Sequence, residues 1–217
     1  MGWIFYTSKG EEKGRSNELF VGPSAPLSSE QLWLDTDEAE IPRVSIVTAL
    51  PGSPVDGQEI YYAADATNGV IWHLRYNANS ASTYKWEFLG GAPLISTILT
   101  NEFFTADGNF RDATTVGPQI TVPLAGDYDV NAEATVNVGA AAGQVYLGLS
   151  VAGATPVPPF WATHYCGAAS ANASPHLICR ITAVALSTVV KVQYTATGGS
   201  NGAARARILR ITPVRVG

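Results

Sequence analysis

Residues 189–196 read VVKVQYTA and carry the clearest strand signal in the chain. The apolar side chains of Val190, Val192 and Tyr194 alternate with polar ones. Successive side chains of a β-strand point to opposite faces of its sheet, so one face of this segment is apolar and the other is polar. The segment therefore predicts a strand with one face on a core and the other in solvent.

Similar segments recur at roughly ten-residue spacing through residues 100–217, with Gly-containing turns between them. The predicted strands are Gln119–Pro123, Tyr128–Val138, Gln144–Val151, Leu177–Leu186, Val189–Ala196 and Ala206–Val214. This regular spacing predicts an antiparallel sandwich or barrel. A region of this length buries roughly two-thirds of its unfolded surface, which is enough for a core of its own.

Residues 43–91 predict a small β-meander. Asn68-Gly69 lies between two strand-like runs, 58–62 and 70–76, and is a strong hairpin signal. A third run, 84–88, alternates in the same way. Three short strands with an aromatic face need another surface on which to bury that face, so we expect a partner chain or the next domain to cover it.

Glycines and prolines interrupt residues 1–42, where only the run 31–34 is strand-like. We therefore expect residues 1–42 to form an irregular N-terminal attachment arm. Residues 92–99 are predicted to be a linker between the meander and the C-terminal domain, residues 100–217. The overall expectation is an all-β chain with a small N-terminal β-meander and a C-terminal antiparallel sandwich.

The composition is that of a folded chain, with 46% hydrophobic and 14% charged residues. No apolar run is long enough to span a membrane, and the N-terminus lacks the pattern of a signal peptide, so we expect synthesis in a cytoplasm without membrane insertion. In that compartment Cys166 and Cys179 are expected to be free thiols, with a disulfide as the alternative.

Charge is distributed unevenly. Residues 1–133 hold all 18 acidic and 7 of the 13 basic residues and carry −11, whereas residues 134–217 carry +6, which together give the net −5. Arg205, Arg207 and Arg210, together with Lys191 and Arg180, are candidates for one basic face that binds phosphates or carboxylates. The alternative is that these arginines lie on separate faces or pair with acidic residues of a neighbouring chain. Nucleic acid is not an expected partner of this acidic chain.

Residues 114–128, with the later runs 145–154 and 207–211, resemble the jelly-roll domains of phage tail and fibre proteins, which are similar in layout to the C1q and tumour-necrosis-factor sandwiches. The runs between residues 50 and 88 resemble a module of minor tail and virion proteins of tailed phages, which we associate with phages of actinobacteria. The resemblance implies a virion component that assembles as a homotrimer, with a C1q-like jelly roll at its C-terminus.

Potential catalytic and metal-binding patterns are weak. Histidine and cysteine are common zinc ligands, but the spacing of His164, Cys166, His176 and Cys179 matches no standard zinc site. The acidic run at residues 35–38 lacks the further ligands of a calcium loop. Glycoside hydrolysis needs two facing carboxylates, and no Asp or Glu follows Glu133. We therefore expect no enzyme activity, no cofactor and no metal.

Two groups of aromatic residues are candidates for binding. Trp161 follows a proline-rich loop and either stacks on a sugar, plugs the end of the sandwich or lies at a subunit interface. Trp3, Phe5 and Trp33 are candidates for virion attachment. The first hypothesis is a minor tail or tail-fibre subunit whose trimeric jelly roll binds a host receptor or surface polysaccharide. The alternative is a capsid decoration or head-fibre protein that stabilises the phage head.

Overall fold

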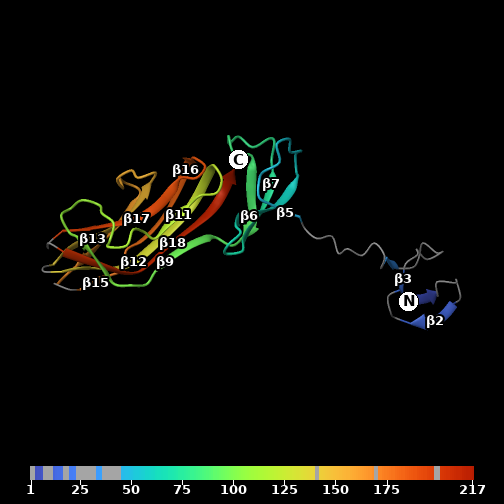
Figure 1. The fold of residues 1–217 in the computed structure, drawn as a ribbon, viewed down its shortest axis with the longest axis horizontal. Helices are drawn as coiled ribbons and strands as arrows, with labels where there is room; N and C mark the ends of the chain where they lie inside the picture. The colour runs from blue at the N-terminus through green and yellow to red at the C-terminus, as the bar shows by residue number, and fades with distance from the viewer. Residues whose placement is uncertain are drawn as a thin grey trace. The chain divides into compact units, whose positions relative to one another are not determined.

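The computed structural model describes residues 45–139, 142–168, 171–197 and 201–217, and the backbone of four short strands before them (Figure 1). The chain divides into two compact units, residues 1–45 and residues 46–217. All regular elements of the described residues are β-strands. The all-β class predicted from the sequence is confirmed.

The first unit contains two small sheets. Strands β1 (Trp3–Tyr6) and β2 (Glu12–Ser16) are antiparallel, and β3 (Phe20–Gly22) is parallel to β4 (Trp33–Asp35). The strand-like run expected at residues 31–34 overlaps β4. The other three strands lie in a segment that was predicted to be irregular, and strands of three to five residues leave little alternation in a sequence.

The second unit contains a two-sheet antiparallel sandwich with jelly-roll connections. Its strands are β9 (Leu94–Ile98), β10 (Glu102–Thr105), β11 (Gln119–Thr121), β12 (Gly126–Val138), β13 (Gly143–Val151), β14 (Trp161–Cys166), β15 (Asn172–Ala173), β16 (His176–Val184), β17 (Val189–Ala196) and β18 (Asn201–Val216). In the larger sheet, β18 pairs with β9, β10 and β12, and β12 pairs with β15 and β16. The smaller sheet has the order β11-β17-β13-β14. The chain crosses between the sheets repeatedly, as a jelly roll requires.

Alternating side chains build the core between the two sheets. Along β12, buried residues alternate with partly exposed ones over the whole strand. In β17, Val190, Val192 and Tyr194 are fully buried, as the alternation at residues 189–196 predicts. All six strands predicted between residues 119 and 214 are present, whereas β14 and β15 were not predicted.

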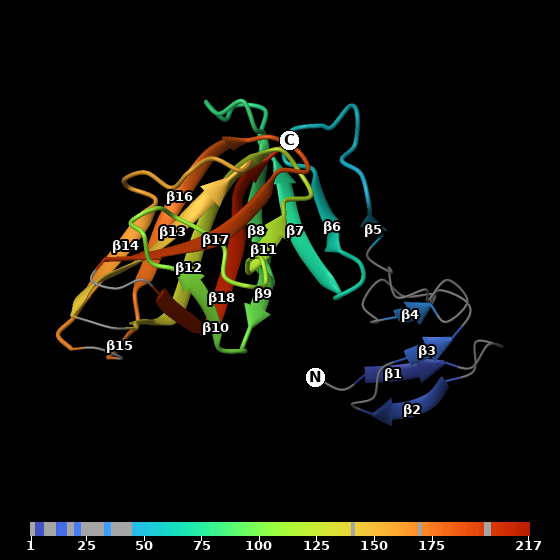
Figure 2. The same cartoon turned by 60° about the vertical axis from the view of Figure 1, so that its left-hand side comes forward.

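The meander is part of the larger sheet. Its strands β6 (Glu59–Asp65), β7 (Val70–Tyr76) and β8 (Trp86–Gly91) are antiparallel, a short β5 (Ile46–Val47) joins β6, and β8 pairs with the C-terminal end of β18. Figure 2 shows the three long meander strands beside the end of β18. The hairpin predicted at Asn68-Gly69 is present, between β6 and β7.

Residues 92–99 do not form a loose linker, because β9 occupies most of them and pairs with β18. The adjacent Gly90-Gly91 pair, which is typical of a linker in composition, ends β8 just before β9 begins. Gly91 has φ 127°, and a Cβ there would collide with the carbonyl oxygen of Ile71. The glycine is required by close packing of the backbone, which composition does not distinguish from a linker.

The aromatic face of the meander is buried against the sandwich. Trp72 and Leu74 are inaccessible to solvent, and the Trp72 ring lies 6.4 Å from that of Tyr128 on β12. Tyr62 donates a hydrogen bond to the carbonyl oxygen of Pro123. The covering surface expected from the sequence is thus the next part of the same chain.

We expect Trp72→Ala to lower the free energy of unfolding of the 46–217 unit by about 3–5 kcal/mol, because it opens a cavity where the meander meets the sandwich. Chemical denaturation followed by circular dichroism measures this loss. Leu89→Ala is the control, since Leu89 is 43% exposed on the same meander. A loss no larger than that of the control would contradict a shared core.

Candidate binding surfaces

The predicted basic face does not form, because Arg207 is fully buried. Arg207 lies on β18 and points between the sheets, where its Nη2 is 2.8 Å from Glu102 Oε2. Its Nη1 donates to the carbonyl oxygens of Thr115 and Gly117, at 3.2 and 3.3 Å. Arg207 is therefore a structural residue, and its assignment to a binding surface was wrong.

The Glu102 carboxylate, which is 14% exposed, is the other partner of this ion pair. It accepts hydrogen bonds from the backbone N of Thr115 at 2.7 Å and from its hydroxyl at 2.8 Å, and a third from the Thr100 hydroxyl at 2.9 Å. These donors, chiefly the Thr115 backbone, lower the pKa of Glu102 from 4.5 to about 2. The cluster therefore connects the loop that contains Thr115 and Gly117 to β10 and β18.

The other basic residues of the C-terminal half are mostly engaged with acidic residues of the same chain. Arg210 Nη1 lies 2.9 Å from Glu133, and Arg180 Nε lies 2.8 Å from Asp129. Lys191 binds Asp112 at 2.7 Å on the smaller sheet. Arg205 is exposed on β18. The excess of positive charge in the sequence is thus neutralised by folding, since the acidic partners come from residues before position 134.

Trp161 belongs to an aromatic cluster on the outward side of the smaller sheet. Its ring lies 5.2 Å from Tyr146 at 66°, and Tyr146 lies 6.5 Å from Phe110 at 78°. All three rings are partly exposed. Tyr165 extends the same side of β14 and is 63% exposed. We call Phe110, Tyr146, Trp161 and Tyr165 the aromatic platform.

Gly148 allows the platform to form. It lies opposite Trp161 in the pairing of β13 with β14, and a Cβ at this position would collide with Phe110 and Pro156. The loops that carry Phe110 and Pro156 can thus rest directly on the strand backbone.

Trp161 was predicted from the sequence as a binding residue, whereas its three aromatic neighbours were not. The available signal was the period-two spacing of strand side chains, which places residues on the same side of a sheet. It relates Trp161 to Tyr165 on one strand, and Gln144, Tyr146 and Gly148 on another. Phe110 carries no such signal because it comes from a loop.

The outward side of the larger sheet is the second candidate surface. The register places Ile95, Arg210, Asn131 and Ile178 in one row across four strands. Ile95 is 56% and Ile178 71% exposed. We call this side of β9, β10, β18, β12 and β16 the long-sheet face.

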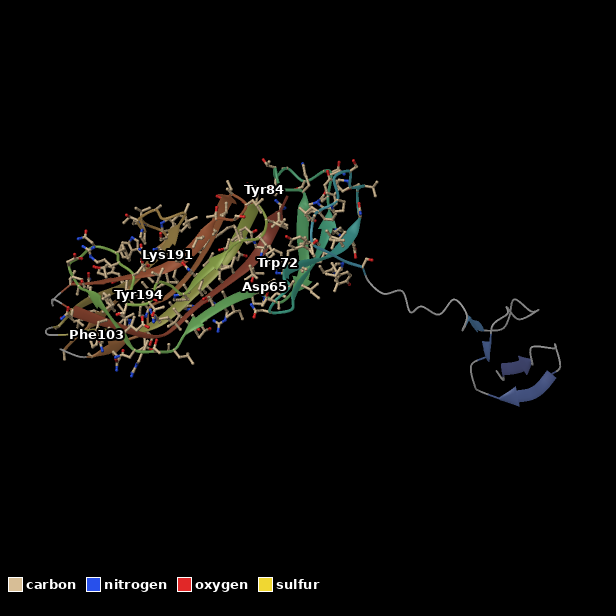
Figure 3. The ribbon with its side chains drawn as sticks, in the orientation of Figure 1. Asp65, Trp72, Tyr84, Phe103, Lys191 and Tyr194 are labelled. Carbon is tan, nitrogen blue, oxygen red and sulfur yellow. The ribbon has the colours of Figure 1, made fainter. Side chains whose placement is uncertain are left out.

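The long-sheet face continues through two further rows. Thr97, Ile208, Glu133 and His176 form the second row, and Phe103, Ala203, Asn137 and Asn172 form the third. Phe103 is 67% exposed and lies toward the end of the sandwich away from Trp72 (Figure 3). A hollow of about 320 Å³ opens beside Glu133, His176 and Ile208.

The four zinc-ligand types do not converge. His164 and Cys166 lie on β14 of the smaller sheet, whereas His176 and Cys179 lie on β16 of the larger sheet. His176 points outward to Asn131, at 2.8 Å. Within the residues that the structure describes, no group of His, Cys, Asp and Glu is arranged to hold a metal ion. Both thiols are free, and burial raises the pKa of Cys179 to about 11.

The residues predicted to attach the chain to a virion lie outside the described side chains. Trp3 and Phe5 are on β1 and Trp33 begins β4, for which only the backbone is described. The acidic run at residues 35–38 lies largely outside the described residues as well. The described part of the chain contains no helix with the length and apolarity needed to cross a bilayer.

No protein-family model and no curated protein sequence matches the chain. Among solved structures it is similar to the tumour necrosis factor Eiger from S. frugiperda, with 8% identity and a TM-score of 0.39, over 58% of this chain and 95% of that one. It is also similar to the globular domain of zebrafish complement 1qA, with 12% identity and a TM-score of 0.35, over 57% and 98% of the two chains.

A third similarity is to infectious bursal disease virus, Gt strain, with 14% identity and a TM-score of 0.32, over 76% of this chain and 42% of that one. These likenesses are too distant to identify a family or an activity.

We expect acid to weaken the Glu102–Arg207 cluster. Because the pKa of Glu102 is lowered on folding, the ionised carboxylate stabilises the protein fully above pH 4.5, and this contribution is lost as the pH falls toward 2. Urea unfolding of the wild type and of Glu102→Gln from pH 7 to pH 2 measures the effect. The variant is expected to be less stable at pH 7 and to approach the wild type near pH 2. A constant difference over this range would contradict the assigned role of the Glu102 charge.

Proposed function

We propose that the protein is a structural subunit of a tailed-bacteriophage virion, of the minor tail or fibre type, whose trimeric jelly roll binds the host cell surface. The observation that carries this proposal is the long-sheet face. It is a sheet surface on which exposed apolar side chains lie among ion pairs, and such a surface suits association with another folded protein.

Self-association through the long-sheet face is favoured by its composition. Ile95, Ile178 and Phe103 offer apolar area, while Arg180–Asp129 and Arg210–Glu133 offer both signs of charge on one surface. A surface that carries both signs can be complementary to a copy of itself. The threefold order of the assembly comes from the resemblance of residues 114–128, 145–154 and 207–211 to trimeric phage jelly rolls.

Binding, and not catalysis, is the proposed activity. Glycoside hydrolysis would have to draw on the five carboxylates between residues 107 and 133, and each already has a partner in the chain. Asp107 binds Arg111, Asp112 binds Lys191, Asp127 accepts a hydrogen bond from the backbone N of Ala183, Asp129 binds Arg180 and Glu133 binds Arg210. The Arg111 hydrogen bonds also lower the pKa of Asp107, whereas a general acid needs a raised pKa.

We expect the wild-type protein to sediment as a trimer and Ile178→Asp to sediment as a monomer, because the new carboxylate would be buried without a partner in the interface. Analytical ultracentrifugation measures both species. Leu186→Asp is the matched control, since Leu186 is 60% exposed but lies outside the long-sheet face. A monomeric wild type, or a trimeric Ile178→Asp, would refute the assigned interface.

Immunogold labelling of whole phage particles with an antibody to this protein tests its place in the virion. We expect label at the tail tip or baseplate. Label spread over the head would replace the host-binding proposal with a role in decorating the capsid.

A further inference from the structure

We propose that the aromatic platform binds neutral hexopyranose units of a host-surface polysaccharide. This inference rests on the proposed function, because it names the ligand through which the jelly roll would contact the host. The platform lies on the smaller sheet, on the opposite side of the sandwich from the long-sheet face, so that both surfaces can be occupied at once.

The rings of the platform are not coplanar, so they offer apolar surfaces in several orientations. The edge-to-face angles, 66° between Tyr146 and Trp161 and 78° between Phe110 and Tyr146, place ring faces next to ring edges. A pyranose has an apolar C–H face and a polar rim, and it can lie against one ring while its hydroxyls remain free to form hydrogen bonds. Trp and Tyr suit such a ligand because each combines an apolar body with a polar atom.

Uncharged hydrogen-bonding side chains surround the rings. Gln193 of β17 and Trp161 of β14 lie on either side of Gly148 in the strand register. Thr163 lies opposite Tyr146 and is exposed. The Tyr146 hydroxyl donates to Gln144 Oε1, which leaves the exposed Gln144 amide group free to donate to a ligand. A few polar groups of this kind around aromatic rings are the usual composition of a small-molecule site.

The charges near the platform favour a neutral ligand. Lys191 on β17 is bound to Asp112, and Arg111, next to Phe110, is bound to Asp107 through contacts of 3.0 and 2.5 Å. Stacking on nucleic acid or binding to an anionic polymer requires unpaired cations along the surface. Because both of these cations are paired, the charges favour an uncharged saccharide.

A single platform is expected to bind weakly, because it is open and partly exposed. Copies linked in one assembly raise the effective concentration of sites, so millimolar single-site affinity is sufficient for attachment to a repeating polymer.

The test is saturation-transfer difference NMR of the purified full-length protein with methyl α-glucopyranoside, methyl α-mannopyranoside and methyl β-galactopyranoside. We expect transfer to the C–H face of at least one of these pyranosides, and a loss of affinity of about tenfold or more in Trp161→Ala and in Gln193→Ala. Tyr61→Ala is the matched control, because Tyr61 is a partly exposed aromatic residue of the meander and should leave binding unchanged. Circular dichroism and sedimentation of each variant confirm that its fold and assembly are intact.

Absence of transfer from the wild type to all three pyranosides would overturn the inference, and so would binding that survives Trp161→Ala. Preferential binding of glucuronate or of a phosphate-bearing sugar, used as competitors, would overturn the neutral-ligand assignment. These results are independent of the immunogold experiment. A saccharide-binding protein that labels the phage head would retain the site and lose the proposed tail location.

Discussion

Strand β18 is the constraint on which the rest of the fold depends. Along one side it pairs with β12 from residue 202 to residue 216. Along the other side it pairs in turn with β10, β9 and β8. The larger sheet of the sandwich and the meander are therefore continuous, and the Trp72–Tyr128 contact buries the face that three isolated meander strands would expose. This continuity explains why residues 46–217 form one compact unit.

The same strand determines which of its arginines are buried and which face outward. Arg207 and Arg210 are three residues apart on β18, so strand alternation places them on opposite faces: Arg207 is buried beside Glu102, and Arg210 lies on the outward face with Glu133. Irregular pairing between Glu133 and Thr135 of β12 lies beside this part of β18. Removing Glu102 would leave the buried charge of Arg207 without a partner. The Glu102–Arg207 pair is therefore required by the fold and does not serve ligand binding.

Folding separates the two proposed activities. The long-sheet face combines exposed isoleucines with charge pairs, and the aromatic platform combines rings with amides and hydroxyls. Because they lie on different sheets of one sandwich, assembly and ligand binding do not compete for the same side chains. A rigid sandwich with two chemically different faces suits a component that must hold other subunits and contact a target.

Period-two alternation was sufficient to place β12, β13, β16, β17 and β18, because each buries one face along most of its length. It failed for β14, where Trp161 to Tyr165 are all at least partly exposed and the burial contrast is absent. Composition failed before β9, because the closely packed Gly90-Gly91 pair has the same composition as a linker.

By itself the sequence determined the class of the fold, the hairpin at Asn68-Gly69 and the aromatic face of the meander, because these depend on neighbours within a few residues. Only the tertiary structure decided which residues from distant parts of the chain meet. Glu102 and Arg207 are brought together by the pairing of β10 with β18, and Phe110 reaches Tyr146 through a loop that rests on Gly148. Contacts between residues so far apart in the chain depend on strand pairing and loop path, which leave no local periodic signal.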